Sequence, residues 1–408
     1  MAVRASPSRP SKRLGVVSDS VALHEVNCCA TPVDFDHVID RTNSASLKWD
    51  HYRPEAIPLW VADMDFACAP AIVEAVRARA RHGVYGYAYA TDDLVAAVVS
   101  WLERRYDWRI EAEWLVWLPS VVSGLNLSCS TSARDASEIL TITPVYPPFL
   151  SAPGNRGHRL HAVPAEFVDG RWALPLDALE RAVTPSTSVL LFCHPHNPLG
   201  RCWHESEVAA IVDLCRRHNL VLCSDEIHCD LLLDAVKHTP AVLAGEGAED
   251  LCITLMSPSK AFNMPGLNFA FAVIPNTELR SRFVAAGRGL LPLPGCMAIA
   301  AAEAAYRHGE PWLAELLDYL RANRDTVEHF VASELPQVNM THVEATYLAW
   351  LNTSGAGVQD VWQACLDAGV ALSPGAIFGD PAYLRLNFAC PRTTLEEGLR
   401  RLRTAIVG

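Results

Sequence analysis

Through the middle of the chain, short runs of mostly apolar residues alternate with segments in which apolar residues recur at helical spacing. The short runs have the length of buried strands and lie at 139–143, 159–163, 189–193, 220–223 and 251–256. Helical spacing occurs between them, for example at 176–183 and 208–218. This alternation predicts a mainly parallel central sheet whose two faces are covered by helices.

The two ends of the chain follow other patterns. Residues 1–31 are rich in Ser, Pro and Arg and lack the apolar core of a signal peptide, so we expect a flexible leader. Two helices are expected next, at 70–81 and 94–106, and Thr91 can cap the second. Towards the C-terminus we expect helices at 298–306, 312–334 and 394–406 and strands at 342–351 and 384–388.

These patterns predict an α/β protein with one large and one smaller domain, which 408 residues can readily form. The leader would end at residue 31, and residues 32–77 would contribute to the small domain. The large domain, with the parallel sheet, would span 78–297. The C-terminal α+β domain would span 298–408.

Charge and cysteine spacing exclude several classes of protein. A net charge of −12 argues against nucleic acid as the main partner, and no apolar run reaches the ~18 residues of a membrane span. The 13 cysteines form no CxxC pair, and several stand inside apolar strands, so we expect reduced thiols in a cytoplasmic protein. His194 and His196 flank a turn without further ligands beside them, so we predict no metal site.

Candidate chemistry lies where two of the expected strands end. The run at 220–223 ends at Asp225 and His228, and the run at 251–256 is followed by Ser257, Ser259 and Lys260. Ligands of open α/β sheets bind just outside the carboxyl ends of the strands. A carboxylate and a lysine at two such ends therefore suggest a cofactor that needs both.

The scarcity of lysine makes Lys260 notable. The chain has 34 basic residues, of which only four are lysines. Arginine cannot lose its proton at working pH, whereas burial can depress the pKa of a lysine enough to make it a nucleophile. An exposed lysine after a strand is the ordinary alternative. We favour a lysine that forms a Schiff base with an aldehyde cofactor.

The other strand-end residues suit the parts of pyridoxal 5′-phosphate (PLP). A carboxylate keeps the pyridine nitrogen protonated, an amide can bond the phenolate oxygen, and an aromatic ring can stack on the pyridine. Hydroxyls and the N–H groups of a helix N-terminus suit the phosphate. Taken singly, Tyr146 reads as a core aromatic, Asn197 as a turn residue before proline, and Arg385 as a solvated charge.

Eight sequence words in order turn these hints into a family resemblance. They are KWD, IPLWVADMDF, HGVYGY, TPVYPPF, HNPLGR, SDEIHCD, SPSKAFNMPGL and RLNFACPR. The chain resembles the fold-type I PLP enzymes of the class I/II aminotransferase superfamily, over nearly its whole length after the leader. Within that superfamily it looks most like the MalY/PatB group of cystathionine β-lyases, or C–S lyases. The resemblance implies the PLP-dependent transferase fold.

The resemblance also implies roles for individual residues. Lys260 would bind the cofactor covalently and move the proton in catalysis. Arg385 and Ala62 would contact the substrate, and His228 marks the β-lyase group. Tyr87 matches a tyrosine that reaches the phosphate from a neighbouring subunit, which implies a homodimer with shared sites. The implied cofactor-binding residues are Val121, Val122, Tyr146, Asn197, Asp225, His228, Ser257, Ser259, Lys260 and Tyr87.

The activity implied is cleavage of a cysteine S-conjugate or cystathionine-like amino acid by β-elimination, giving a thiol, pyruvate and ammonia. An alternative on the same scaffold is aminotransfer, or decarboxylation-coupled deamination that tailors an S-conjugated natural-product intermediate. A catalytically idle binding protein on this fold is a further alternative. All three would take a small-molecule partner rather than a membrane or nucleic acid.

Two departures from the family pattern affect the phosphate region. LPSVVSG replaces the usual Pro-Gly before the Val pair, and GLN at 266–268 has no basic residue where many relatives have Arg or Lys. The phosphate would then depend on hydroxyl and N–H groups, so we expect weaker cofactor binding.

Overall fold

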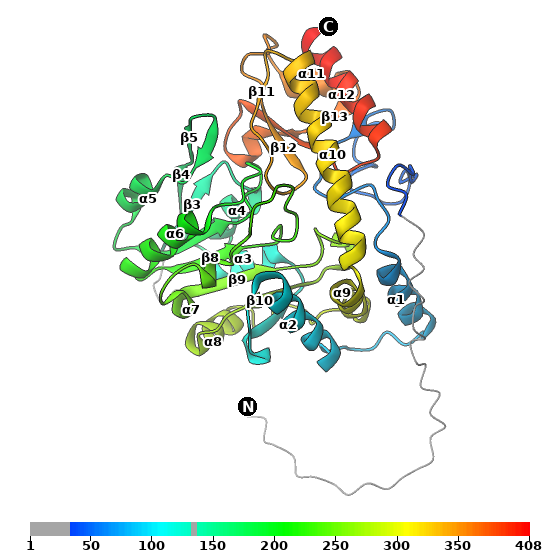
Figure 1. The fold of residues 1–408 in the computed structure, drawn as a ribbon. Helices are drawn as coiled ribbons and strands as arrows, with labels where there is room; N and C mark the ends of the chain where they lie inside the picture. Colours follow the sequence, from blue (N-terminus) through cyan, green and yellow to red (C-terminus); the bar gives the residue numbers. More distant parts are fainter. Residues whose placement is uncertain (1–32, 132–136) are drawn as a thin grey trace, which may run out of the picture. The chain divides into compact units, whose positions relative to one another are not determined.

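The central sheet of the computed structural model has seven strands in the order β2-β10-β9-β8-β7-β3-β4 (Figure 1). The structure describes residues 33–131 and 137–408. The strands are β2 (Leu115–Leu118), β3 (Glu138–Thr143), β4 (Arg159–Pro164), β7 (Thr187–Cys193), β8 (Val221–Asp225), β9 (Cys252–Met256) and β10 (Ala270–Val273). Only the pairings of β10 with β2 and β9 are antiparallel. The mainly parallel sheet is therefore confirmed.

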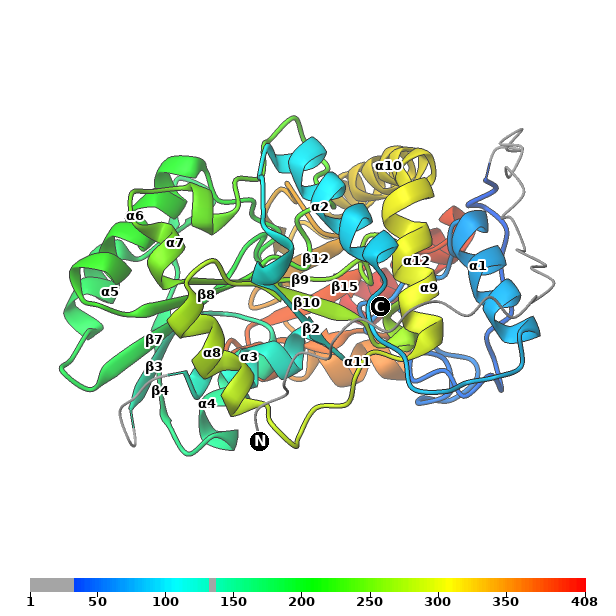
Figure 2. The ribbon, with the colours of Figure 1, turned by 90° about the horizontal axis from the view of Figure 1, so that it is seen from below.

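Helices cover both faces of this sheet, which explains why its strands read as continuous apolar runs. On one face, α3, α4 and α8 join the strands in a single hydrophobic core. On the other face lie α5 and α6 (Figure 2). The helices of this region are α3 (Val121–Cys129), α4 (Pro147–Asn155), α5 (Leu176–Ala182), α6 (Glu205–Arg217), α7 (Ala248–Leu251) and α8 (Thr277–Ala286).

A second sheet of four antiparallel strands, in the order β11-β12-β15-β14, is built from the C-terminal part of the chain. The strands are β11 (Asn339–Met340), β12 (Leu348–Asn352), β14 (Ser373–Pro374) and β15 (Tyr383–Asn387). Strand β1 (Ile57–Pro58) pairs in parallel with β13 (Val370–Ala371). This pairing fastens residues near the N-terminus to the C-terminal region.

The remaining elements connect and cover the two sheets (Figures 1 and 2). The other α-helices are α1 (Pro70–Arg81), α2 (Asp92–Tyr106), α9 (Cys296–His308), α10 (Glu310–Glu334), α11 (Val361–Asp367) and α12 (Arg392–Val407). A small hairpin consists of β5 (Glu166–Val168) and β6 (Arg171–Ala173), and short 3-10 turns are η1 (Ala112–Trp114), η2 (Ala241–Leu243), η3 (Pro265–Leu267) and η4 (Gly375–Phe378). Among the described residues, no helix is long and apolar enough to cross a membrane.

Most expected elements occur close to their expected positions. The Thr91 hydroxyl accepts the Leu94 N–H at 3.1 Å and so caps α2 as expected. The strand expected at 342–351 is wrong over its first half, because β12 begins only at Leu348. The backbone at 344–346 instead bonds with Gly200 and Leu231, two contacts that local pattern cannot reveal.

The predicted domain limits stay predictions. The leader at 1–31 lies outside the described residues, and residues 34–408 form one compact unit.

Candidate active site

The expected chemistry converges in one pocket at the carboxyl ends of the central strands. The pocket has about 720 Å³ of space that no protein atom fills, including open solvent at its mouth. Ten of the twelve residues singled out in the sequence line it, and they are Ala62, Val121, Val122, Tyr146, Asn197, Asp225, His228, Ser257, Ser259 and Lys260. The sequence therefore located the pocket.

Asp225 is the last residue of β8 and is buried beneath the pocket. One of its oxygens accepts the backbone N–H of Ile227 at 3.1 Å. Burial raises the pKa of this carboxyl from 3.8 to about 7, against the opposing attraction of Lys260. A cationic partner that enters the pocket would therefore stabilise the carboxylate.

Lys260 follows β9 by four residues, and its side chain enters the same pocket. Its Nζ donates a hydrogen bond of 2.5 Å to the carbonyl oxygen of Ala62. Burial, followed by repulsion from Arg385, lowers the pKa of the amine from 10.5 to about 8. A substantial fraction of the amine is therefore neutral near neutral pH, as a nucleophile or general base requires.

A strap formed by residues 59–66 borders the pocket through Ala62. The Ala62 carbonyl also accepts a hydrogen bond of 2.9 Å from the buried Tyr347 hydroxyl. Asn387 donates to the carbonyls on either side of Ala62, at 2.6 and 2.7 Å. These bonds fix the one backbone oxygen to which the Lys260 amine is bonded.

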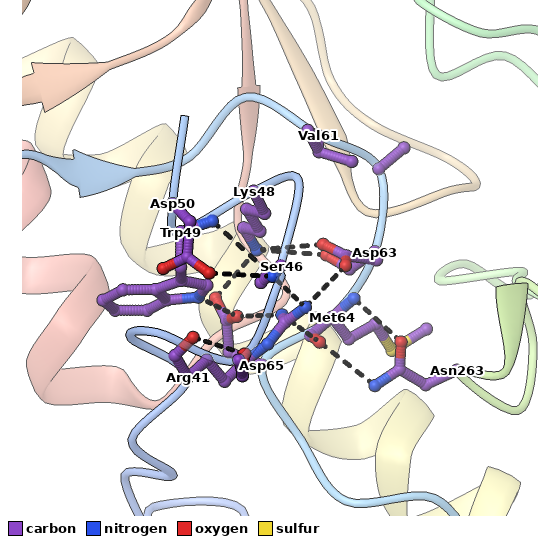
Figure 3. Close-up of polar contacts among 12 residues, drawn as sticks. Arg41, Ser46, Lys48, Trp49, Asp50, Val61, Asp63, Met64, Asp65 and Asn263 are labelled. Atoms are coloured by element: carbon purple, nitrogen blue, oxygen red, sulfur yellow. Dashed lines mark hydrogen bonds and ion pairs between the residues drawn. The ribbon is translucent and has the colours of Figure 1, made fainter. Parts of the chain in front are cut away.

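The next residues of the strap are held by a polar network (Figure 3). Lys48, which is 1% exposed, pairs with Asp65 at 2.7 Å, and Arg41 pairs with the other Asp65 oxygen at 2.5 Å. Asn263, three residues after Lys260, bonds both the N–H and the carbonyl of Met64. The strap and the loop that carries Lys260 are thus bonded to each other. In the sequence, the only sign of this network is the apolar run that ends at two aspartates.

The N-terminus of α3 forms another wall of the pocket. Ser120 is its N-cap and accepts the Ser123 N–H at 3.1 Å. The N–H groups of Val121 and Val122 belong to the first turn of the helix and therefore have no acceptor within it. Gly124 lets the helix approach β9, because a Cβ there would lie 2.6 Å from Leu255. Such a helix end attracts an anionic group.

Hydroxyl groups complete this wall. The N–H of Ser259 donates to the Ser257 hydroxyl oxygen at 3.0 Å, and the Ser257 hydroxyl donates to the Phe269 carbonyl at 2.6 Å. Ser120 and Asn268 also line the pocket, although they were not among the predicted site residues. The sequence features that could have indicated them are the small residues before α3, for Ser120, and the tripeptide GLN at 266–268, for Asn268.

Arg385 lies on β15 and is buried next to the pocket residue Asn197, and no acidic side chain of the described residues forms an ion pair with it. It donates to the Asn197 side-chain oxygen at 3.0 Å and to the Trp60 carbonyl at 2.9 Å, and its guanidinium lies 4.6 Å from the Phe378 ring centroid. Its Nε has no partner within the described part of the chain. Burial lowers the pKa of the guanidinium to about 10. A buried cation of this kind favours a carboxylate ligand.

The sequence comparison now decides the family. Residues 54–402 match the family of aminotransferases class I and II. The chain belongs to this family. It is 35% identical to cystathionine beta-lyase PatB of Bacillus subtilis (strain 168), over 92% of this chain and 100% of that protein. It is 32% identical to protein MalY of Escherichia coli (strain K12), over 91% and 98% of the two chains.

Solved structures of family members agree with the architecture. The crystal structure of OvoB superposes with a TM-score of 0.89 at 41% identity, covering 92% of this chain and 99% of OvoB. Cystalysin from Treponema denticola, whose structure contains PLP, gives a TM-score of 0.88 at 30% identity, with coverage of 92% and 99%. The predicted fold-type I architecture, the MalY/PatB-like grouping and PLP dependence are confirmed.

The pocket of this family member fits PLP on its own geometry. Val121 and Val122, whose N–H groups have no acceptor within α3, line the same pocket as the Asp225 carboxyl group and the Lys260 side chain. The raised pKa of Asp225 favours a partner that carries a proton, as a pyridine nitrogen does. The Nδ1 atom of His228 is buried in the pocket without a partner among the described residues, so it can also bond a ligand.

Tyr87 is the predicted cofactor residue that the single chain does not bring to the pocket. Its side chain is fully exposed, in a loop where Val84, Tyr85 and Tyr89 are exposed as well. Its place is compatible with the expectation that it serves a neighbouring subunit, which no contact within one chain can test.

Proposed function

We propose that this protein is a PLP-dependent C–S β-lyase that cleaves a cysteine S-conjugate or a cystathionine-like amino acid to a thiol, pyruvate and ammonia. The names of its relatives support the class of reaction. The observation that carries the substrate class is the buried Arg385 without an anion, close to a lysine with a depressed pKa. Together they suit the carboxylate and the Cα proton of one α-amino acid.

We assign the residues in the following way. When bound, PLP supplies an electron sink that stabilises negative charge at the substrate Cα. The Asp225 carboxylate would pair with the protonated pyridine nitrogen. Asn197 would form a hydrogen bond to the phenolate oxygen of the ring, and Tyr146 would stack on the ring. Ser257, Ser259 and the N–H groups at the start of α3 would bind the phosphate.

On the substrate side, Arg385 would bind the α-carboxylate through two parallel hydrogen bonds, and the strap at Ala62 would border it. The Lys260 amine would take the proton from Cα, because its lowered pKa leaves part of it neutral. Departure of the thiolate from Cβ then completes the elimination, and the released 2-aminoacrylate takes up water to give pyruvate and ammonia. The pocket wall at Ala62 fixes the amine at 2.5 Å, which limits where that proton can be removed.

Product analysis tests the proposal. The purified protein is incubated with L-cystathionine and with a set of S-alkyl-L-cysteines, and pyruvate, ammonia and free thiol are measured. Equal amounts of pyruvate and thiol support β-elimination. A keto acid that keeps its sulfur indicates aminotransfer, and released carbon dioxide indicates decarboxylation-coupled deamination. No product from any of these substrates, with a Lys260→Ala variant that behaves like the wild type, would favour a catalytically idle scaffold.

We also propose a homodimer in which Tyr87 completes the partner's site. The exposed loop around Tyr87 leads into α2, and the loop with exposed Leu290 and Leu293 leads into α9, which packs beside α2. These apolar groups suit a subunit interface. Mixing Lys260→Ala with Tyr87→Ala tests this, because each mixed dimer would hold one intact site and regain activity. Sedimentation as a monomer, or no regain on mixing, contradicts it.

Location and domain limits are further proposals. Eleven cysteines lie in the described residues and all are free thiols, which supports a reducing, cytoplasmic location. The β1–β13 pairing supports a small domain made of residues 32–77 and 298–408, beside a large domain at 78–297.

A further inference from the structure

Three potential metal ligands from separate segments meet beside the central sheet. His194 follows β7, Cys202 follows the turn that carries Asn197, and His238 lies in the loop after β8. All three side chains are at most 2% exposed, and one donor atom from each lies within 4.8 Å of the other two. The sequence suggested no metal because only His194 and His196 stood together, and His196 bonds the Pro144 carbonyl instead.

The two histidines leave a buried nitrogen unused. The Nε2 atom of His194 lies 3.2 Å from the Thr239 carbonyl, and that of His238 lies 2.8 Å from a Glu226 oxygen. The Thr239 carbonyl and the ionised Glu226 carboxylate only accept, so each Nε2 then carries the hydrogen and each Nδ1 presents a lone pair. In the residues described, neither Nδ1 has a partner. Such unpaired acceptors are costly in a core unless something binds them.

We propose that His194, Cys202 and His238 bind a divalent transition-metal ion, for which zinc suits the two nitrogens and one sulfur best. The bond from His238 to Glu226 is the carboxylate–histidine arrangement that orients metal-binding imidazoles. Glu226 is itself fixed by the Ser224 hydroxyl at 2.8 Å and the Ala241 N–H at 2.9 Å. None of these contacts belongs to the PLP pocket.

Binding requires a modest contraction of the cluster. Zinc–nitrogen bonds of about 2.0–2.1 Å and zinc–sulfur bonds of about 2.3 Å bring tetrahedral ligand atoms to roughly 3.3–3.8 Å apart. The donor atoms would therefore approach by about 1 Å, and the two rings, now stacked at 4.3 Å and 28°, would tilt apart. The Lys237 carbonyl, 3.9 Å from the Cys202 sulfur, is available as a fourth ligand.

The proton balance is simple. Each imidazole carries one hydrogen, at Nε2, so both rings enter the site neutral. The Cys202 thiol gives up one proton to solvent as its sulfur binds the ion. No electron is transferred, because zinc has no redox chemistry.

The ion would have a structural role next to the active site. It would join the end of β7, the turn that carries Asn197 and the loop after β8. It would not touch the reacting atoms. This inference therefore does not depend on the proposed lyase activity.

The test measures metal content in the full-length holoenzyme, purified without a polyhistidine tag, exposed to zinc chloride and desalted. We expect about one zinc per chain, and less than about a tenth in Cys202→Ala and His194→Asn. Cys365→Ala, which removes another buried thiol outside the cluster, is the matched control and should keep its zinc.

Cobalt supplies a second readout that does not depend on the variants folding. Cobalt(II) added to the zinc-free protein should give a thiolate-to-cobalt charge-transfer band and the visible bands of a tetrahedral ion. The proposal is overturned if the wild type retains no zinc after desalting, if its cobalt spectrum shows no thiolate ligand, or if folded Cys202→Ala and His194→Asn keep the metal.

Discussion

Replacing Asp225 by Asn should stabilise the cofactor-free protein while it weakens cofactor binding. The carboxylate is buried, it accepts the Ile227 N–H, and its pKa is raised to about 7. At pH 8 the folded protein therefore holds a negative charge that the unfolded chain keeps in water. An amide of nearly the same shape removes that charge.

The size of the effect follows from the pKa. The rise from 3.8 to about 7 corresponds to roughly 4 kcal/mol of lost stability at pH 8. The amide adds a donor that needs a partner, so we expect a net gain of about 2–4 kcal/mol. At about 2.1 cal/mol/K per residue, a unit of this length gains about 3–5 °C in Tm.

The sign of the pH dependence separates this cause from others. Between pH 3.8 and about 7 the folded protein keeps a proton at Asp225 that the unfolded chain has lost. The wild type therefore loses stability as the pH rises through that range. The advantage of Asp225→Asn should therefore grow from pH 4 to pH 7 and then stay constant. Contributions from buried groups that do not interact with Asp225 cancel in the difference between the two proteins.

The assay is urea unfolding of both cofactor-free proteins between pH 4 and pH 8, with PLP titration on the folded proteins. Asp169→Asn, at an exposed hairpin turn, is the control and should show no change. We expect PLP binding to weaken at least tenfold in Asp225→Asn, because the pyridine nitrogen loses its charged partner. A variant that is less stable at pH 8, or a difference that does not vary with pH, would refute the reasoning.

Three further substitutions test separate walls of the pocket. Arg385→Lys should lower kcat/KM for amino-acid substrates about 100-fold, as measured by steady-state kinetics. An ammonium group cannot form the two parallel hydrogen bonds that a guanidinium forms with a carboxylate. Asn268→Lys should tighten PLP binding about three- to tenfold at low salt, with the gain shrinking as salt is added. Gly124→Ala should cost about 1–3 kcal/mol in urea unfolding, because its Cβ would meet Leu255 at 2.6 Å. Gly154→Ala, in a helix with nothing within 4 Å, is its control and should not destabilise.

The sequence predicts the central sheet and the strand-end residues because both depend on short-range pattern. Buried parallel strands are continuous apolar runs, and the residue that ends such a run lies at the binding edge of the sheet. Asp225 and Lys260 could therefore be assigned to one pocket from two separate runs. Their shared burial, which sets both pKa values, needs the packed structure.

Contacts between distant segments could not be predicted in this way. Lys48 reads as one of four lysines in a polar stretch, yet it is buried and paired with Asp65. Residues 344–346 read as strand, yet their backbone bonds go to Gly200 and Leu231. His194 and Cys202 carry no recognisable ligand spacing, because the third donor, His238, comes from another loop.

Burial destabilises the charged form of three groups around the pocket, and this favours binding of the cofactor before the substrate. Burial lowers the pKa of Lys260 and Arg385 and raises that of Asp225, so each group is destabilised in its charged form. The cofactor can offset the cost of burying both Asp225 and Lys260, whereas a substrate carboxylate is needed to offset the cost of burying the Arg385 charge. Because Arg385 also repels the charged amine, engaging Lys260 with the cofactor first lowers the cost of keeping Arg385 charged for substrate. Cofactor binding should therefore precede and strengthen recognition of the amino acid.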